Sequence, residues 1–210
     1  MALDIFEELD ILREELRSED WDTIEDRYIQ LARKHAGAKM ANLIAKIGMA
    51  DYQQQLEPAL KEALEAAQED EASAVTFEYD VDNGWESTFF VCPNYMMEED
   101  ESDEWAAEWD REIEGPGLPE FADIYAEHGG FSGEDAAIAI TLLLIARTAC
   151  AMGRVVAAMP ENGVAICMGY HDQESLWRIR EMELAEDDDF DEDEEDEDED
   201  DSYDDDDDDR

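Results

Sequence analysis

The sequence predicts an α+β protein, with a mainly helical domain around a small antiparallel sheet and a disordered polyacidic C-terminal tail. Three observations predict this class. Apolar residues recur at helical spacing in residues 1–70, apolar and polar residues alternate in residues 75–91 and 164–170, and a long apolar segment covers residues 132–159. We therefore expect helices around a sheet made of one hairpin and one further strand.

A change of composition divides the chain into two parts. From Glu186 onward almost every residue is Asp or Glu, and a segment with so little apolar surface cannot offset the entropy lost on ordering. We expect a single domain over residues 1–185, with N-terminal helices over 1–70 and the sheet and central helix over 73–185. Residues 186–210 are expected to be a disordered acidic tail.

Four helices are expected before the first strand. Asp4 is a candidate N-cap for the first, and Thr23 and Asp26 have the spacing of a capping box at the start of the second. Gly37 is expected to end the second helix, because glycine is common just past a helix end. A short third helix follows, and the fourth is expected to carry Pro58 in its first turn.

The hairpin has two possible registers. A two-residue loop would leave Trp85 and Phe89 on the face that carries Glu78, whereas a three-residue loop with a left-handed Gly84 gathers the apolar residues on one face. We therefore expect the second register. It pairs Val81 with Trp85, Phe77 with Phe89, and Val75 with Val91.

Residues 132–159 are expected to form one long helix that begins at a capping box of Ser132 and Asp135. Its first turns are apolar on all sides, as in a buried helix. A membrane span needs about 20 apolar residues, and Arg147 and Arg154 interrupt this one, so we expect a core helix. The two arginines are expected to pair with buried carboxylates and hold the neighbouring helices in register; a buried anion site is the alternative.

The remaining segments are shorter. A helix is expected to carry Trp105 and Trp109, with Ile113 continuing the same spacing. The strand at 164–170 has one face of small side chains, against which something bulky can pack. A final helix is expected after Asp172.

The chain is strongly acidic, with 63 Asp and Glu residues against 14 Lys and Arg and a formal charge of −49. Leaving out the tail's 21 acids and one arginine still leaves 42 acidic against 13 basic residues, a balance of −29. Such a surface repels nucleic acid and anionic lipid and attracts basic proteins and cations. We expect a basic protein as partner, no direct contact with nucleic acid or membrane, and loose binding of divalent cations by the tail.

The sequence gives no sign of catalysis or of a bound cofactor. None of His35, His128 and His171 has metal-ligand spacing, and no Walker loop, nucleophile elbow, dinucleotide fingerprint or zinc pattern is present. An EF-hand loop is excluded, because its glycine is the sixth residue and Gly84 is the fifth from Asp80. We therefore expect that the protein is not an enzyme.

Three cysteines indicate the compartment. Cys92, Cys150 and Cys167 form no CxxC pair and lie in apolar segments, as buried reduced thiols do. The N-terminal residues show no basic region and no cleavable apolar segment of a secretory signal. A cytoplasmic location is expected.

The candidate partner-binding site lies between the hairpin and the central helix. An exposed aromatic anchor within a charged rim is typical of a binding hot spot, whereas a tryptophan pair packed on the core is the alternative, since tryptophan is usually well buried. The anchor would be formed by the two tryptophans and the rim by their acidic neighbours: Asp103, Glu104, Trp105, Glu108, Trp109 and Asp110.

These observations lead to one main hypothesis and two alternatives. The main hypothesis is a non-enzymatic acidic binding protein that neutralises a basic macromolecule, such as an immunity- or antitoxin-type protein or a nucleic-acid-mimicking inhibitor in a bacterial cytoplasm. One alternative is an acidic chaperone for basic proteins that depends on the tail. The other is a housekeeping or enzyme domain of a salt-adapted organism, in which the acidity serves solvation.

Overall fold

The computed structural model describes residues 2–97, 103–173 and 175–182. Within these ranges the chain forms six α-helices, a 3-10 helix and five strands, which confirms the α+β class. The predicted disordered tail at 186–210 and the predicted domain end at residue 185 lie outside the described residues. The elements are α1 (Ile5–Leu16), α2 (Trp21–His35), α3 (Ala38–Ala45), α4 (Ala50–Glu69), β1 (Ala74–Tyr79), β2 (Ser87–Cys92), η2 (Glu104–Ala107), β3 (Arg111–Glu114), α5 (Pro119–His128), α6 (Asp135–Ala158), β4 (Ala165–Tyr170) and β5 (Trp177–Arg180).

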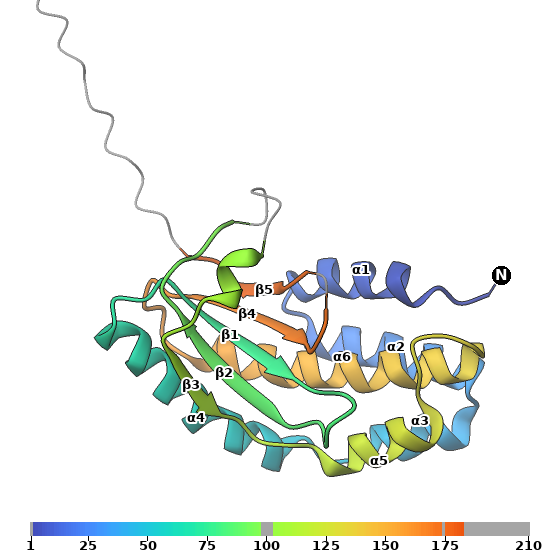
Figure 1. The fold of residues 1–210 in the computed structure, drawn as a ribbon. Helices are drawn as coiled ribbons and strands as arrows, with labels where there is room; N and C mark the ends of the chain where they lie inside the picture. Colours follow the sequence, from blue (N-terminus) through green and yellow to red (C-terminus); the bar gives the residue numbers. More distant parts are fainter. Residues whose placement is uncertain (1, 98–102, 174, 183–210) are drawn as a thin grey trace, which may run out of the picture.

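The five strands form one mixed sheet in the order β3-β2-β1-β4-β5. β1 is antiparallel to β2 but parallel to β4, so the prediction of a purely antiparallel sheet is wrong. β3 and β5 extend the two edges in antiparallel pairing. A parallel pair needs a long crossover, and α6, which precedes β4 and lies behind the sheet in Figure 1, is part of it.

Helix α6 is the centre of the helical layer. It contacts each of the other five α-helices, and every residue from Ile138 to Gly153 is buried. The predicted core helix is therefore confirmed, and its all-round apolar surface follows from burial on all sides. By length and composition α6 would also suit a membrane span, but 89% of its most apolar window is buried within the protein.

The hairpin has the predicted register. Phe77 lies opposite Phe89, with ring centroids 4.9 Å apart. Gly84 is left-handed as predicted, with φ +71°, and Trp85 follows with φ +55°. The ladder ends before Val81 and Trp85, so this predicted pair belongs to the turn, although both residues are buried.

The helix starts agree only in part with the predicted caps. Asp4 caps α1 as predicted. The capping box of Thr23 and Asp26 does not form, because Asp20 accepts from the Thr23 amide at 3.3 Å and caps α2 earlier. Pro58 lies inside α4 rather than in its first turn, since the residues before it favour helix and extend α4 toward the N-terminus.

The capping box predicted at the start of α6 is also wrong. The helix begins at Asp135, and Glu134 at the N-cap position makes no side-chain cap hydrogen bond, so Ser132 lies outside the helix. The Asp135 carboxylate accepts from the Leu3 amide at 3.0 Å and lies 3.3 Å from His35 Nδ1. Tertiary contacts to the N-terminal segment and to α2 thus replace a local cap.

The two arginines of α6 pair with carboxylates as predicted, but these carboxylates are not buried as expected, since the Glu25 side chain is 19% exposed and that of Asp22 is 96% exposed. Arg147 is 5% exposed, and its Nε donates to Glu25 Oε1 on α2 at 2.7 Å. Arg154 donates to Glu25 Oε2 at 2.9 Å and to Asp22 Oδ1 at 2.7 Å. One carboxylate therefore joins both arginines, and the pairs fix α2 along α6.

Two segments that were predicted to be helices have a different structure. The helix expected to carry Trp105, Trp109 and Ile113 is wrong, because η2 ends before Trp109 and Ile113 lies in β3. The helix expected after Asp172 is wrong as well. That residue lies in a turn with φ +67°, and residues 177–180, in which apolar residues alternate with arginines, form β5.

Candidate functional site

The sheet has an inner face against α4 and α6 and an outer face, which is in front in Figure 1. Part of the outer face is covered by the chain that follows β2. Trp105 of η2 is 6% exposed and packs there against Ala74, Cys92 and Cys167. The small side chains on this face of β4 accommodate the indole, as the sequence predicted.

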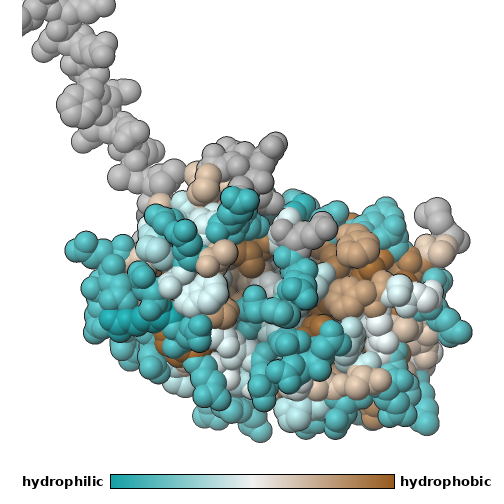
Figure 2. Space-filling view, viewed as in Figure 1, coloured by the Kyte–Doolittle hydropathy of each residue, from teal (hydrophilic) through white to brown (hydrophobic). Residues whose placement is uncertain are grey.

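The rest of the outer face carries carboxylates. The pairing register places Glu112 of β3 beside Phe90 of β2, and it places Glu114, Thr88 and Glu78 in one row across three strands. Glu112 and Glu114 are exposed, and the Glu78 side chain is 42% exposed. We call this surface the acidic sheet face (Glu78, Glu112 and Glu114). In Figure 2 hydrophilic residues gather on the left and along the lower rim of this side of the molecule, whereas pale and hydrophobic residues appear in the centre and toward α1.

Trp109 stands at the border of the acidic sheet face. It is 45% exposed, and its ring centroid lies 4.9 Å from that of Phe90. Its Nε1 donates to Glu112 Oε1 at 2.9 Å. The indole is thus fixed by a ring contact and a charge-assisted hydrogen bond while part of its surface remains open to solvent.

The structure separates the six predicted site residues into two groups, of which Asp103 and Trp105 face inward. Asp103 Oδ1 accepts from Arg178 at 2.6 Å, and the other oxygen accepts from the Leu176 amide at 2.8 Å. The Arg178 side chain is only 6% exposed. Both predicted residues therefore hold the connection after β2 onto the sheet, and Trp105 does not serve as an exposed anchor.

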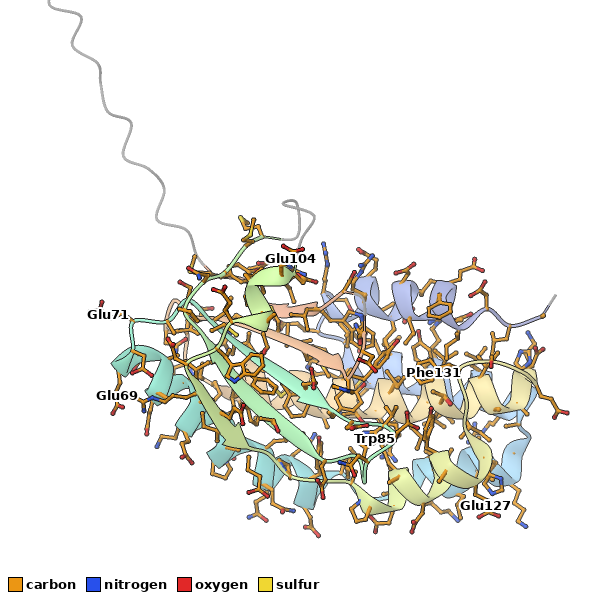
Figure 3. All side chains as sticks on the ribbon, viewed as in Figure 1. Glu69, Glu71, Trp85, Glu104, Glu127 and Phe131 are labelled. Carbon is orange, nitrogen blue, oxygen red and sulfur yellow. The ribbon has the colours of Figure 1, made fainter. Side chains whose placement is uncertain are left out.

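Glu104, Glu108, Trp109 and Asp110 form the outward group, and all four are exposed. Figure 3 shows Glu104 on η2, above the strands of the outer face. Sequence reasoning missed the acidic sheet face, since the short alternation around Ile113 was assigned to a helix. That alternation of acidic and apolar residues was the available signal for a strand.

The basic residue of β3 does not neutralise this surface. Arg111 donates to Asp70 Oδ1 at 2.7 Å and to Glu69 Oε2 at 3.2 Å, at the end of α4. The hydrogen bond with Asp70 is the main cause that raises the Arg111 pKa. In Figure 3 Glu69 lies at the edge of the sheet, away from Glu104. The Arg111 guanidinium is thus already paired with carboxylates at the C-terminal end of α4 and leaves the negative charge of the acidic sheet face unpaired with it.

Glu78→Gln is expected to lower the pKa of His171. His171 Nδ1 lies 2.9 Å from Glu78 Oε1, and this hydrogen bond raises the imidazole pKa above its ordinary value of 6.5. Because the folded-state pKa is raised, the pair stabilises the fold below about pH 6.5, and this contribution is lost as pH rises through the folded pKa. An NMR titration of His171 measures the shift, and an unchanged midpoint in the variant would contradict it. Asp172→Asn, with its carboxylate 3.8 Å from Nε2, is expected to have a smaller effect.

The described residues offer little for thiol or metal chemistry. All three cysteines are buried and free, as predicted. Burial raises the pKa of Cys92 to about 11 and that of Cys150 to about 12, and it raises the Cys167 pKa as well. Since the thiolate is the reactive form, these thiols are in an unreactive state at neutral pH. No group of three or more His, Cys, Asp or Glu side chains that could hold a metal ion occurs among the described residues.

In comparisons with known proteins, no family model, no curated protein and no solved structure matches the chain.

Proposed function

We propose that this protein is a non-enzymatic binding protein that neutralises a basic macromolecular partner, as an immunity- or antitoxin-type protein or a nucleic-acid-mimicking inhibitor does. The observation that supports this most is the environment of Trp109. The indole is fixed by Phe90 and Glu112 yet 45% exposed, and it borders a sheet face that carries three glutamates.

The chemistry of this surface suits a Lys or Arg side chain. The face of an exposed indole attracts a cation, and neighbouring carboxylates such as Glu108 and Glu114 can accept hydrogen bonds from it. Because Trp109 is already held in place, its binding costs little further ordering entropy. A phosphate group would meet only repulsion here, so we propose a basic protein as partner rather than nucleic acid or a membrane surface.

The charge outside the tail also supports a folded binding surface. Residues 1–185 carry 42 acidic and 13 basic residues, so the acidity does not depend on the tail alone. Charge of this density speeds the encounter with a cationic partner. The free, buried cysteines fit a reducing compartment, and we propose the cytoplasm, in a bacterium, as its location.

Trp109→Ala is expected to weaken the binding of a Lys- and Arg-rich peptide by about 30-fold, since a hot-spot residue contributes about 2 kcal/mol or more. The measurement is isothermal titration calorimetry with the full chain at about 0.15 M salt, where the screening length is about 8 Å. Wild-type affinity in the variant would contradict the role of Trp109.

A matched pair of double variants tests whether binding depends on the acidic sheet face or only on the total negative charge of the protein. Glu112→Gln with Glu114→Gln alters the acidic sheet face, whereas Glu57→Gln with Glu62→Gln removes the same charge from exposed positions on α4, which packs on the other side of the sheet. We expect the first pair to lose affinity and the second to keep it. Equal losses would refute the defined face and show that only total charge matters. Loss of binding on truncation after Leu184 would favour a tail-dependent chaperone, and folding only at molar salt would favour acidity that serves solvation.

A further inference from the structure

Helix α1 carries an exposed aromatic side chain. Phe6 is 65% exposed, more than any other large apolar side chain among the described residues. Leu9, Asp10 and Arg13 follow it at helical spacing and therefore lie on the same side of α1. A single exposed apolar residue needs no explanation, but all four of these side chains also line one pocket.

This pocket has a volume of about 390 Å³, within the range of about 300 to 1,000 Å³ that is usual for ligand sites. Its second wall is the end of β4, the turn that follows and the start of β5. Figure 1 shows this turn beside α1, and in Figure 2 hydrophobic residues appear in the same direction. We call it the α1 pocket (Phe6, Leu9, Asp10, Tyr170, Asp172 and Trp177).

The α1 pocket has an apolar interior and an acidic rim. Leu9 is 7% exposed and Trp177 is 3% exposed, so both lie inside. The side chains of Asp10 and Asp172 are 71% and 91% exposed, so both carboxylates lie at the solvent edge. A long cationic side chain has the same division, with an apolar stem and a charged head that stays in water.

The one cation that lines the α1 pocket is paired within its own helix. Arg13 Nη2 lies 3.5 Å from Asp10 Oδ1, and its Nε lies 3.9 Å from Glu14 Oε1. An ionised carboxylate offers about four acceptor positions, and both of these carboxylates are largely exposed. Together with Asp172 they outnumber the single guanidinium, so the rim repels an anion and attracts a cation.

The aromatic lining favours arginine over lysine. A guanidinium is planar and weakly hydrated, stacks on aromatic rings and binds a carboxylate through two hydrogen bonds, whereas an ammonium is compact and strongly hydrated. The exposed ring of Phe6 and the partly buried ring of Tyr170 stand in the same pocket as the two aspartates. The pocket therefore combines the two groups that an arginine head uses together.

The α1 pocket adjoins the acidic sheet face. Nδ1 of His171 lies 2.9 Å from Glu78 Oε1 on the acidic sheet face, and Nε2 of the same ring lies 3.8 Å from Asp172 Oδ1 at the pocket. One imidazole ring thus spans the distance between the two. A partner that covers the acidic sheet face also reaches the pocket, and its second contact then forms within the same complex.

We propose that the α1 pocket takes an arginine side chain of the basic partner. The aliphatic stem lies against Leu9 and Trp177, and the guanidinium lies at the rim, where Asp10 and Asp172 accept its hydrogen bonds. This inference rests on the proposed function, because the arginine belongs to the same partner. It names a residue that the partner presents beside the cation bound at Trp109.

Methyl NMR of the full chain tests the pocket with a small probe, N-acetylarginine amide. At about 0.15 M salt the probe is expected to shift the Leu9 methyl signals with a Kd of about 1 mM, as a ligand of this size usually does. The lysine analogue is expected to bind severalfold more weakly. N-acetylcitrulline amide has nearly the same shape without the charge and is expected to leave the signals in place.

Two outcomes of this titration would overturn the proposal. Equal shifts with the arginine and citrulline probes would show that the pocket takes an apolar chain whatever its charge. No shift with either probe would show that arginine does not enter the pocket.

A substitution at the exposed ring tests the pocket in the binding of an Arg-rich peptide, measured by isothermal titration calorimetry. Phe6→Ser is expected to weaken binding about tenfold, because it removes the ring on which the guanidinium stacks. Leu43→Ser is the matched control, since Leu43 is 52% exposed on α3 and lies outside the pocket. It is expected to keep wild-type affinity, and circular dichroism checks that both variants are folded.

A double variant tests the rim. Asp10→Asn with Asp172→Asn removes both carboxylates, and asparagine suits the positive φ of +67° at Asp172, so the turn is retained. The affinity for the Arg-rich peptide is expected to fall about tenfold. Glu57→Gln with Glu62→Gln removes the same charge from α4 and is expected to leave it unchanged; equal losses would overturn the rim as the partner of the guanidinium.

The pocket and the proposed function fail in different ways. If the Arg-rich peptide does not bind the wild-type protein, the proposed function is refuted, and the arginine assignment with it. If the peptide binds and Trp109→Ala weakens the binding but Phe6→Ser does not, only the assignment of the α1 pocket is refuted. Weaker binding in both variants supports both.

Discussion

Arg147→Met is expected to lower the free energy of unfolding by about 3 to 5 kcal/mol, the usual cost of breaking a buried ion pair on one side. The guanidinium donates to Glu25 at 2.7 Å, to the Ile47 carbonyl at 2.9 Å and to the Ile44 carbonyl. Methionine fills similar space but satisfies none of these acceptors. The loss therefore affects α2 and the end of α3 together.

Urea unfolding followed by circular dichroism measures this change, and a melting temperature about 10 °C lower is expected for a protein of this size. Arg154→Met is the matched control. Its side chain is 28% exposed; it shares Glu25 with Arg147, and its second partner, Asp22, is 96% exposed, so about 1 kcal/mol is expected. Equal effects of the two substitutions, or no change for Arg147→Met, would contradict the structural role of the buried arginine.

Asp103→Ala is expected to destabilise the fold by about 3 kcal/mol, because it leaves the guanidinium of Arg178 without its carboxylate on a covered face of the sheet. The Arg178 side chain is 6% exposed and lies 2.6 Å from Asp103 Oδ1. The substitution also removes the acceptor of the Leu176 amide. Both contacts connect the chain after β2 to β5.

Glu108→Ala provides the comparison, since it lies close in sequence but is exposed. It is expected to change the free energy of unfolding by less than about 0.5 kcal/mol, as surface substitutions usually do. Chemical denaturation of both variants measures the difference. If Asp103→Ala is as stable as the wild type, Asp103 does not fix the covering segment. The Asp103 carboxylate of the wild type would then be open for a partner.

The parts of the fold that could be predicted from the sequence are those that depend on a local pattern of residues. The α6 stretch was identifiable because burial on all sides requires an apolar helix, and the hairpin register followed from keeping Phe77 and Phe89 on one face. Arg147 was informative because cations are rare in this chain and a buried one needs a partner.

Beyond the hairpin, the sequence did not predict which strands are neighbours. The alternation at 164–170 indicates a strand, but only the packing of α6 decides that it lies parallel to β1. The strand β5 has four residues and follows Asp172, whose position resembles a helix cap. In so short a segment tertiary pairing overrides local preference.

The same limit applies to the candidate site. Composition located an acidic region with two tryptophans, but nothing local distinguishes the buried Trp105 from the exposed Trp109. That distinction depends on which residue meets the small side chains of β4. The glutamates of β3 were missed because they join the site only through pairing with β2.

The parallel pairing of β1 with β4 also has a consequence for synthesis on the ribosome. Tyr79 ends β1, whereas β4 begins at Ala165, about 86 residues later. At about 5 to 20 residues per second, one side of the nascent hairpin has no native neighbour for about 4 to 17 s. During this time its unpaired backbone groups can pair with other chains, and the many carboxylates already synthesised would keep such chains apart.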